Sequence, residues 1–252
     1  MAFSSYVRTL RYLWSSLTLK IRIFIDKSIQ LAGPFYIFLA VTLISCIIYL
    51  FFTTILPSIH SVNSFKGISH VIISIWLIFN VFFNYIYCIK TDPGSPSDFT
   101  DVEHDSISSS NGQEASGVAM RWCKNCQKAK PPMTHHCHIC KRCILKMDHH
   151  CPWMHNCIGF FNYRFFFLFL FYLWIGCAYT TYMASIPLQA TDEDEDITQI
   201  LFTFVLAIAV FFALTGLFWF HVYLVLSAQV YIKFRFSFAF FNQHIYQDLL
   251  KS

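Results

Sequence analysis

The sequence predicts an α-helical integral membrane protein: four transmembrane helices, with a cytosolic, cysteine-rich, two-zinc β-hairpin domain between the second and the third. Three observations lead to this fold class. Apolar residues make up 56% of the 252 residues, against roughly 45–50% in soluble domains. Four long segments carry no charge, and a short polar stretch between the second and third of them holds seven of the ten cysteines.

The four uncharged segments are each long enough to cross the hydrocarbon core, which takes about 20 apolar residues in a helix. They run over residues 34–56, 68–89, 165–186 and 200–226, and none contains Asp, Glu, Lys or Arg. We therefore expect four membrane spans in these positions.

Basic residues predict the topology, because loops rich in Lys and Arg stay in the cytosol. Residues 1–33 carry five of them, and the segment between the second and third spans carries nine. The loop 187–199 has none and contains the acidic run 192–196. We expect this loop to be lumenal and both termini, including the tail 227–252, to be cytosolic. The membrane itself we expect to be that of the ER or Golgi.

Residues 1–33 fit two descriptions. Trp14, Leu17, Leu19 and Ile21 alternate with spaced basic residues, as in a helix that lies in the membrane interface. The same residues also fit a positively charged flank that orients the first span.

The region after the second span divides into a linker and a metal-binding domain. Residues 90–120 begin with the turn signal Asp92-Pro93-Gly94 and continue with many polar and few apolar residues, which predicts a flexible cytosolic linker. Residues 121–164 have too few apolar residues for a core of their own. Metal binding is therefore expected to supply much of their folding free energy, with short β-hairpins at the Cys-x2-Cys turns.

The pattern Cys-x2-Cys-x9-His-x6-Cys occurs twice in this domain, the second copy shifted by fourteen residues. The first copy comprises Cys123, Cys126, His136 and Cys143, and the second comprises Cys137, Cys140, His150 and Cys157. Three thiolates and one imidazole are a ligand set of tetrahedral structural zinc sites. A register that uses His135 and His149 instead is equally periodic, so the repeat alone leaves the choice of histidines open.

One cysteine of the domain, Cys151, belongs to neither copy. A third copy could begin there, but its second cysteine position holds Met154. A thiol becomes a nucleophile when a neighbouring base favours its thiolate form. His149 could be that base, and Asp148 could orient its imidazole.

The segment around Asp148-His149-His150-Cys151 resembles the cysteine-rich domain of the DHHC family of membrane protein S-acyltransferases, also called palmitoyltransferases. The resemblance runs from Cys123 to about Phe167, and the four spans and the Asp92-Pro93-Gly94 turn are similar as well. It implies that His136 and His150 bind zinc. It also implies that Asp148, His149 and Cys151 are the catalytic set.

The resemblance further implies a reaction. Cys151 takes a long-chain acyl group from an acyl-CoA such as palmitoyl-CoA and passes it to cysteine thiols of membrane-associated proteins that face the cytosol. The acyl chain is expected in a cavity among the spans, where Gly176 could deepen it. A glycine in a span can instead serve close helix packing. Lys146 and Arg164 could meet the CoA phosphates. No nucleic-acid partner is expected, because the domain is attached to a membrane and shows no recognition helix.

The tail departs from the family pattern, in which Thr-Thr-x-Glu follows the fourth span. This chain reads Ser227-Ala228-Gln229-Val230-Tyr231-Ile232-Lys233. An impaired family member is therefore one alternative. A second alternative, independent of the tail, is a non-catalytic membrane-anchored zinc adaptor in which Cys151 is inert.

Overall fold

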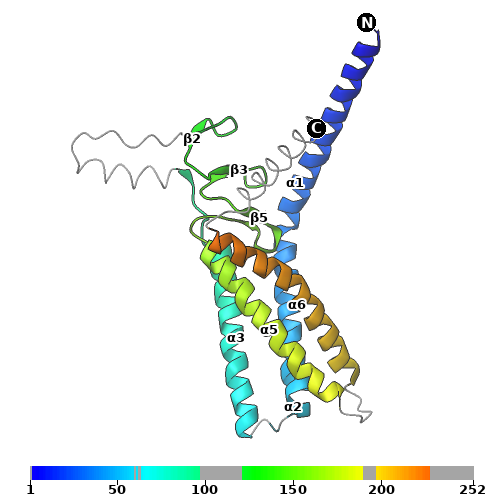
Figure 1. Cartoon of the computed structure of the whole chain (residues 1–252), viewed down its shortest axis with the longest axis vertical. Helices are drawn as coiled ribbons and strands as arrows, with labels where there is room; N and C mark the ends of the chain where they lie inside the picture. The colour runs from blue at the N-terminus through cyan, green and yellow to red at the C-terminus, as the bar shows by residue number, and fades with distance from the viewer. Residues whose placement is uncertain (1, 60, 62–63, 97–120, 190–196, 228–252) are drawn as a thin grey trace, which may run out of the picture.

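The structure is built on four helices that are long and apolar enough to cross a membrane. The computed structural model describes residues 2–59, 61, 64–96, 121–189 and 197–227. The four helices form a bundle with the hairpins at one end (Figure 1): α1 (Ala2–Leu50), α3 (Phe65–Lys90), α5 (Tyr163–Leu188) and α6 (Ile197–Leu226). The predicted fold class is thereby confirmed. Most of the predicted linker, loop and tail lies outside the described residues.

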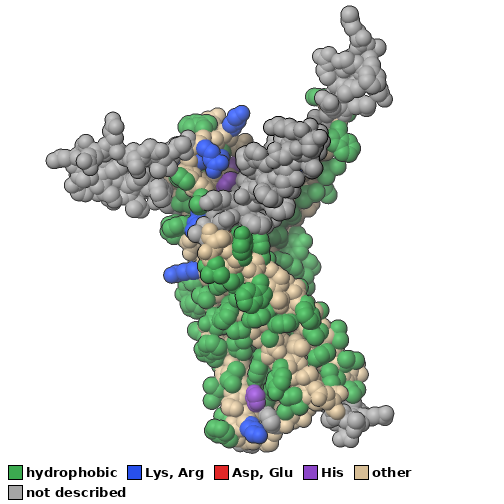
Figure 2. All heavy atoms as spheres, viewed as in Figure 1, with side chains coloured by type: hydrophobic (Ala, Val, Ile, Leu, Met, Phe, Trp, Pro, Cys, Tyr) green, Lys and Arg blue, Asp and Glu red, His purple; other side chains and the backbone are tan. Residues whose placement is uncertain are grey.

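Hydrophobic side chains are spread over the face of this bundle seen in Figure 2. Phe38, Phe79 and Phe212 are each more than 60% exposed. An apolar surface of this extent would promote aggregation in water, but it is suited to contact with the hydrocarbon core of a membrane. Inside the bundle, α5 packs against both α3 and α6.

Aromatic stacking and one hydrogen bond join α5 to α6 in the middle of the bundle. The Trp174 ring stacks on Phe211 and Phe218 at centroid distances of 5.7 and 5.1 Å. Its Nε1 donates to Thr215 Oγ1 at 2.8 Å. This bond satisfies a polar group where lipid offers no partner.

Helix α1 is longer than the predicted first span. Its 49 residues correspond to roughly 74 Å at 1.5 Å per residue, more than twice the thickness of a hydrocarbon core. The predicted span begins at residue 34, and Pro34 lies inside the continuous helix, although an interior proline removes one backbone donor and clashes with the preceding turn. Beyond α1, a π-helical segment η1 (Phe51–Ile55) and the short α2 (Leu56–Ile59) complete the span.

The metal-binding domain consists of three antiparallel two-stranded hairpins. They are formed by β1 (Arg121–Cys123) with β2 (Lys128–Lys130), β3 (His135–Cys137) with β4 (Arg142–Ile144), and β5 (His149–Cys151) with β6 (Asn156–Ile158). The first strands of the three hairpins begin at residues 121, 135 and 149. Each fourteen-residue repeat of the sequence therefore corresponds to one hairpin. Gln127, Lys141 and His155 have positive φ at the same interval, because each hairpin makes the same tight turn.

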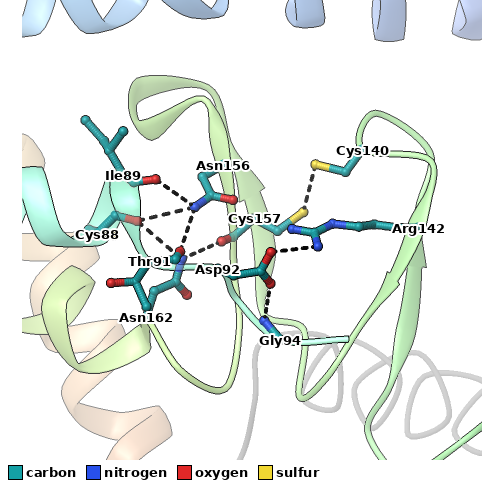
Figure 3. A network of polar contacts seen from close by, with 10 residues as sticks. All are labelled: Cys88, Ile89, Thr91, Asp92, Gly94, Cys140, Arg142, Asn156, Cys157 and Asn162. Carbon is teal, nitrogen blue, oxygen red and sulfur yellow. Dashed lines mark hydrogen bonds and ion pairs between the residues drawn. The ribbon is translucent and has the colours of Figure 1, made fainter. Parts of the chain in front are cut away.

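Two asparagines fasten this domain to the end of α3 (Figure 3). The Asn156 amide donates to the carbonyls of Cys88, Ile89 and Thr91 at 3.4, 3.2 and 3.1 Å. The Asn162 amide donates to the carbonyls of Cys88 and Cys157. The last carbonyls of a helix have no partner within the helix, so the domain supplies the donors that α3 lacks.

An acidic turn makes a second attachment on the same side of the domain. Asp92 Oδ1 accepts from the Gly94 amide at 2.8 Å, and Asp92 Oδ2 pairs with Arg142 Nη1 at 2.8 Å (Figure 3). The Gly94 carbonyl accepts from the Leu145 amide. The predicted Asp92-Pro93-Gly94 turn therefore ends α3 and also contacts the second hairpin.

Helix α1 meets the third hairpin at a glycine. Gly33 is buried, and a Cβ atom placed there would overlap the His155 ring. One turn further along, Tyr36 packs edge-to-face on Trp153 with 5.4 Å between the centroids. Both partners lie in or next to the 3-10 turn η2 (Pro152–Met154), so α1 directly supports the segment that follows Cys151.

We predict that Gly33→Ala destabilises the protein. Its methyl group would force His155 aside, and overpacking of this kind costs about 1–3 kcal/mol. Thermal unfolding in detergent should show a lower Tm for this variant. Gly216→Ala is the matched control, because its Cβ would enter open space and alanine has the better helix propensity. His155→Ala should restore tolerance to Gly33→Ala, and equal Tm values for the two glycine variants would contradict the contact.

Candidate functional site

The eight predicted metal ligands lie in two clusters. Each holds three cysteines and one histidine, with the candidate ligand atoms within 4.8 Å of one another, in these sets: Cys123, Cys126, His136 and Cys143; Cys137, Cys140, His150 and Cys157. The structure thus assembles the register with His136 and His150 and leaves His135 and His149 out of both clusters.

The distances in the second cluster suit a tetrahedral metal. Cys140 Sγ lies 3.4 Å from Cys157 Sγ and 3.4 Å from His150 Nδ1. A zinc ion with Zn–S bonds of about 2.3 Å would hold its sulfur ligands roughly 3.8 Å apart. The Cys140 amide also points at Cys137 Sγ from 3.3 Å, which favours the thiolate form that a metal needs. The donor set therefore fits zinc.

Each cluster joins two successive hairpins. The tight turn of one hairpin supplies two cysteines, and a directly opposed pair on the next hairpin supplies the histidine and the third cysteine. These opposed pairs are His136 with Cys143 and His150 with Cys157. A metal in each cluster would fix the three hairpins into one rigid module.

The third hairpin repeats this turn without belonging to a further cluster among the described residues. Cys151 takes the place that Cys137 holds in the second hairpin, but Met154 takes the place of Cys140. Met154 is 1% exposed and packs with Cys151 in the hydrophobic core at the end of the helix bundle. The Cys151 thiol is therefore free of metal and lies against the membrane-spanning helices.

Asp148 and His149 form the polar side of this position. The Asp148 side chain is fully buried, and its Oδ2 lies 2.7 Å from His149 Nδ1. Burial alone would lower the pKa of His149, but hydrogen bonds to Asp148 and Cys151 outweigh it and raise the pKa to about 9. The carboxylate orients the imidazole, and the other ring nitrogen remains for the thiol.

A cavity opens among α1, α3 and α5 below this site. Its volume is about 80 Å³, and its wall is apolar, with Ile48, Phe51, Leu77, Val81 and Leu173 among the lining residues. Val81 also belongs to the core that contains Cys151. On α3, Val81 lies one and two turns from Tyr85 and Cys88 of that core, so the cavity and the thiol share one face of the helix.

Gly176 lies in the cavity wall. A Cβ at this position would meet no atom within 4 Å, so the missing side chain leaves space inside the cavity. Its position agrees with the interpretation that this glycine deepens a cavity. Close helix packing, the alternative role of a glycine in a span, would bring neighbouring atoms nearer.

The two basic residues expected near CoA phosphates are both exposed. Lys146 lies in the turn after β4 with a φ of 44°. Arg164 lies in the first turn of α5, with its guanidinium 4.5 Å from the centre of the Phe165 ring. A role in phosphate binding remains a prediction for both.

Some residues that position the site could not be found from the sequence. The Tyr85 hydroxyl donates to the Trp153 carbonyl at 2.8 Å, and Asn156 and Asn162 hold the domain on α3. Each of these contacts joins segments that are 65 or more residues apart. No spacing or local pattern signals them.

We predict two zinc ions per chain, and different outcomes for two equivalent cysteines. Cys137→Ala should release at least one zinc, because it removes a ligand. Cys151→Ala should retain both, although Cys151 has the same place in its hairpin. Metal analysis of the purified variants tests this, and loss of one equivalent from Cys151→Ala would overturn the ligand assignment.

Comparisons with known proteins agree with this site. The family model for DHHC palmitoyltransferases matches residues 118–235. The chain is 36% identical over 223 residues to "Putative ZDHHC-type palmitoyltransferase 4" of Dictyostelium discoideum, which covers 80% of this chain and 62% of the relative. It is 32% identical over 208 residues to "Probable protein S-acyltransferase 16" of Arabidopsis thaliana, covering 78% of this chain and 73% of the relative.

A third relative shares a shorter region. "Palmitoyltransferase ZDHHC16A" of Danio rerio is 39% identical over 149 residues, which is 58% of this chain and 35% of the relative. The chain thus spans less than two thirds of the length of two of these three proteins. Similarity to the Arabidopsis protein nevertheless extends over most of both chains. This multi-pass membrane protein, with its two Cys3His clusters and a free thiol beside Asp-His, belongs to the DHHC palmitoyltransferase family.

Proposed function

We propose that the protein is an S-acyltransferase that moves a long-chain acyl group from acyl-CoA to protein cysteines. The position of Cys151 carries this proposal. It is the one thiol of the hairpin domain outside the two clusters, it interacts with the Asp148–His149 pair, and it packs in the core at the end of the membrane helices.

The reaction consists of two thioester exchanges. In the first, His149 takes the Cys151 proton, the sulfur attacks the thioester carbonyl of acyl-CoA, and the bond to the CoA sulfur breaks as that sulfur regains a proton. In the second, a substrate cysteine loses its proton to His149, attacks the acyl-Cys151 thioester and releases Cys151. Bond types are conserved in both steps, so positioning and thiol activation determine the rate.

The cavity supports a long acyl chain as the transferred group. Ligand pockets typically have mainly apolar walls, as this cavity has. Its volume of about 80 Å³ means that the lining side chains would have to move apart to admit a long chain. The metals would keep a structural role, since four protein ligands close each coordination sphere. Lys146 and Arg164 are proposed to meet the CoA phosphates.

The proposed setting places the hairpin domain and both termini in the cytosol of an ER or Golgi membrane. The basic residues of the first and middle segments support this orientation, and acyl-CoA is then available on the side of Cys151. The protein substrates would be membrane-associated proteins with cysteines near the same surface.

We predict that purified wild-type protein, incubated with labelled palmitoyl-CoA in detergent, acquires a hydroxylamine-labile label. Cys151→Ser should abolish it, because a thioester can no longer form. His149→Ala should slow labelling by about 10²–10⁴-fold, the usual contribution of a general base. Cys46→Ser, in the exposed part of α1, is the control and should label normally. Absence of label on zinc-loaded wild-type protein would favour the adaptor or the impaired member.

We further predict that Gly176 sets acyl-chain length. Gly176→Leu should place a side chain in the cavity, so that palmitoyl-CoA loses efficiency relative to a shorter donor such as decanoyl-CoA. Gly216→Leu is the control, because Gly216 lies on the exposed face of α6 with no atom within 4 Å of a Cβ. Competition between the two donors measures the ratio. The same ratio in both variants would place the chain outside this cavity.

A further inference from the structure

One ionisable side chain within the membrane-spanning helices lies next to the catalytic pair. His221 belongs to α6 and is 2% exposed. Burying an imidazole within a span is costly, and such residues generally carry a function or a specific partner. The reaction proposed above makes no use of it.

His221 has a hydrogen-bonding partner on another helix. Its Nδ1 lies 3.1 Å from the hydroxyl of Tyr163, the first residue of α5. The bond joins the last turns of α6 to the start of α5, directly after the third hairpin. The Asp148 carboxylate lies close enough to interact electrostatically with both residues.

Ring contacts extend from this pair to His149. The Phe166 ring lies edge-to-face against both histidines, with centroid distances of 5.1 Å to His149 and 5.1 Å to His221. The two histidine rings are themselves 6.2 Å apart. His149 is therefore held on one side by the carboxylate and on another by Phe166 and His221.

This second support has a physical purpose. The hydrogen bond to Asp148 at 2.7 Å fixes one ring nitrogen, but a ring held at one atom can still rotate about that contact. The His149 side chain is 28% exposed, so surrounding protein atoms do not restrict it on every side. The neighbouring rings of Phe166 and His221 restrict this rotation, so that the second nitrogen stays available to the thiol.

We infer that His221, held by Tyr163, is a positioning residue that fixes the His149 imidazole directly and through Phe166, so that α6 supplies part of the catalytic centre. The inference rests on the acyl transfer proposed above for the importance of His149. Its structural basis, the contacts among Tyr163, Phe166, His221 and His149, is independent of the acyl donor.

A purely structural role can be separated from this one, because α5 and α6 share a second hydrogen bond. Trp174 Nε1 donates to Thr215 Oγ1 at 2.8 Å, about three turns from the Tyr163 level. Thr215→Val removes that bond, just as Tyr163→Phe and His221→Phe remove the one near the site. The three variants keep similar side-chain shapes.

The experiment measures two rates for each variant. One is the initial rate of Cys151 acylation at saturating palmitoyl-CoA, together with the KM for this donor. The other is the rate at which iodoacetamide alkylates Cys151, followed by peptide mass spectrometry, which needs no acyl donor. Both are repeated in a His149→Gln background.

We expect Tyr163→Phe and His221→Phe to lower the acylation rate constant and the alkylation rate about tenfold, a part of the roughly 10²–10⁴-fold that a general base contributes. The KM should be unchanged, and Thr215→Val should stay within twofold of wild type. In the His149→Gln background, His221→Phe should have no further effect, because a residue that acts through another is not additive with it.

Two results would overturn the inference: equal losses in Thr215→Val and His221→Phe, or an undiminished effect of His221→Phe in the His149→Gln background. If wild-type protein takes no acyl label while His221→Phe still slows alkylation through His149, acyl transfer fails and the positioning role stands.

Discussion

Metal ligation between successive hairpins is the interaction on which the rest of the site depends. Each hairpin has strands of only three residues, and an isolated two-stranded hairpin is marginal in water. A structural zinc contributes about 10–16 kcal/mol in small peptides. Because each cluster takes ligands from two hairpins, that free energy sets the position of each hairpin relative to the next. The third hairpin, which carries His149 and Cys151, is placed by the second.

Contacts with the membrane helices then fix the position of the hairpin module at the end of the bundle. Asn156 and Asn162 donate to carbonyls at the end of α3, where water and lipid meet and where an unsatisfied carbonyl would be costly. Gly33 and Tyr36 of α1 press on the other side of the same hairpin. In the function proposed above, this position would let an acyl chain enter the apolar interior of the bundle while its polar thioester remains at the surface. A catalytic residue on a flexible loop would lack this alignment.

Much of this arrangement could be predicted from the sequence, and the reasons are specific. Uncharged segments of sufficient length identified the four spans, and the fourteen-residue repeat identified both ligand sets except for the choice between neighbouring histidines. That choice depends on which face of a strand meets the turn of the preceding hairpin, and the period alone does not determine it. The family resemblance favoured His136 and His150, and the structure places them in the clusters.

The contacts of Asn156, Tyr85, Gly33 and Phe166 could not be predicted in the same way. Each depends on two segments that meet only after the bundle and the hairpin module have formed. The continuity of α1 could not be predicted for a different reason. The absence of charges marks the segment 34–56 as a span but does not show whether the helix continues before it, and α1 runs through Pro34.

The repeat also explains why a reactive thiol stands at this end of the module. Each cluster combines the turn of one hairpin with the paired strands of the next, so a row of three hairpins can form only two such clusters. Among the described residues, no further hairpin complements the strand pair of the first hairpin, Trp122 opposite Ala129, or the turn of the last. In this architecture the turn of the third hairpin is the last unit of a repeat, like the terminal unit of a solenoid, and it has no following hairpin to pair with. Cys151 thus has the surroundings of a metal ligand without the metal, and its lone pairs remain available for chemistry.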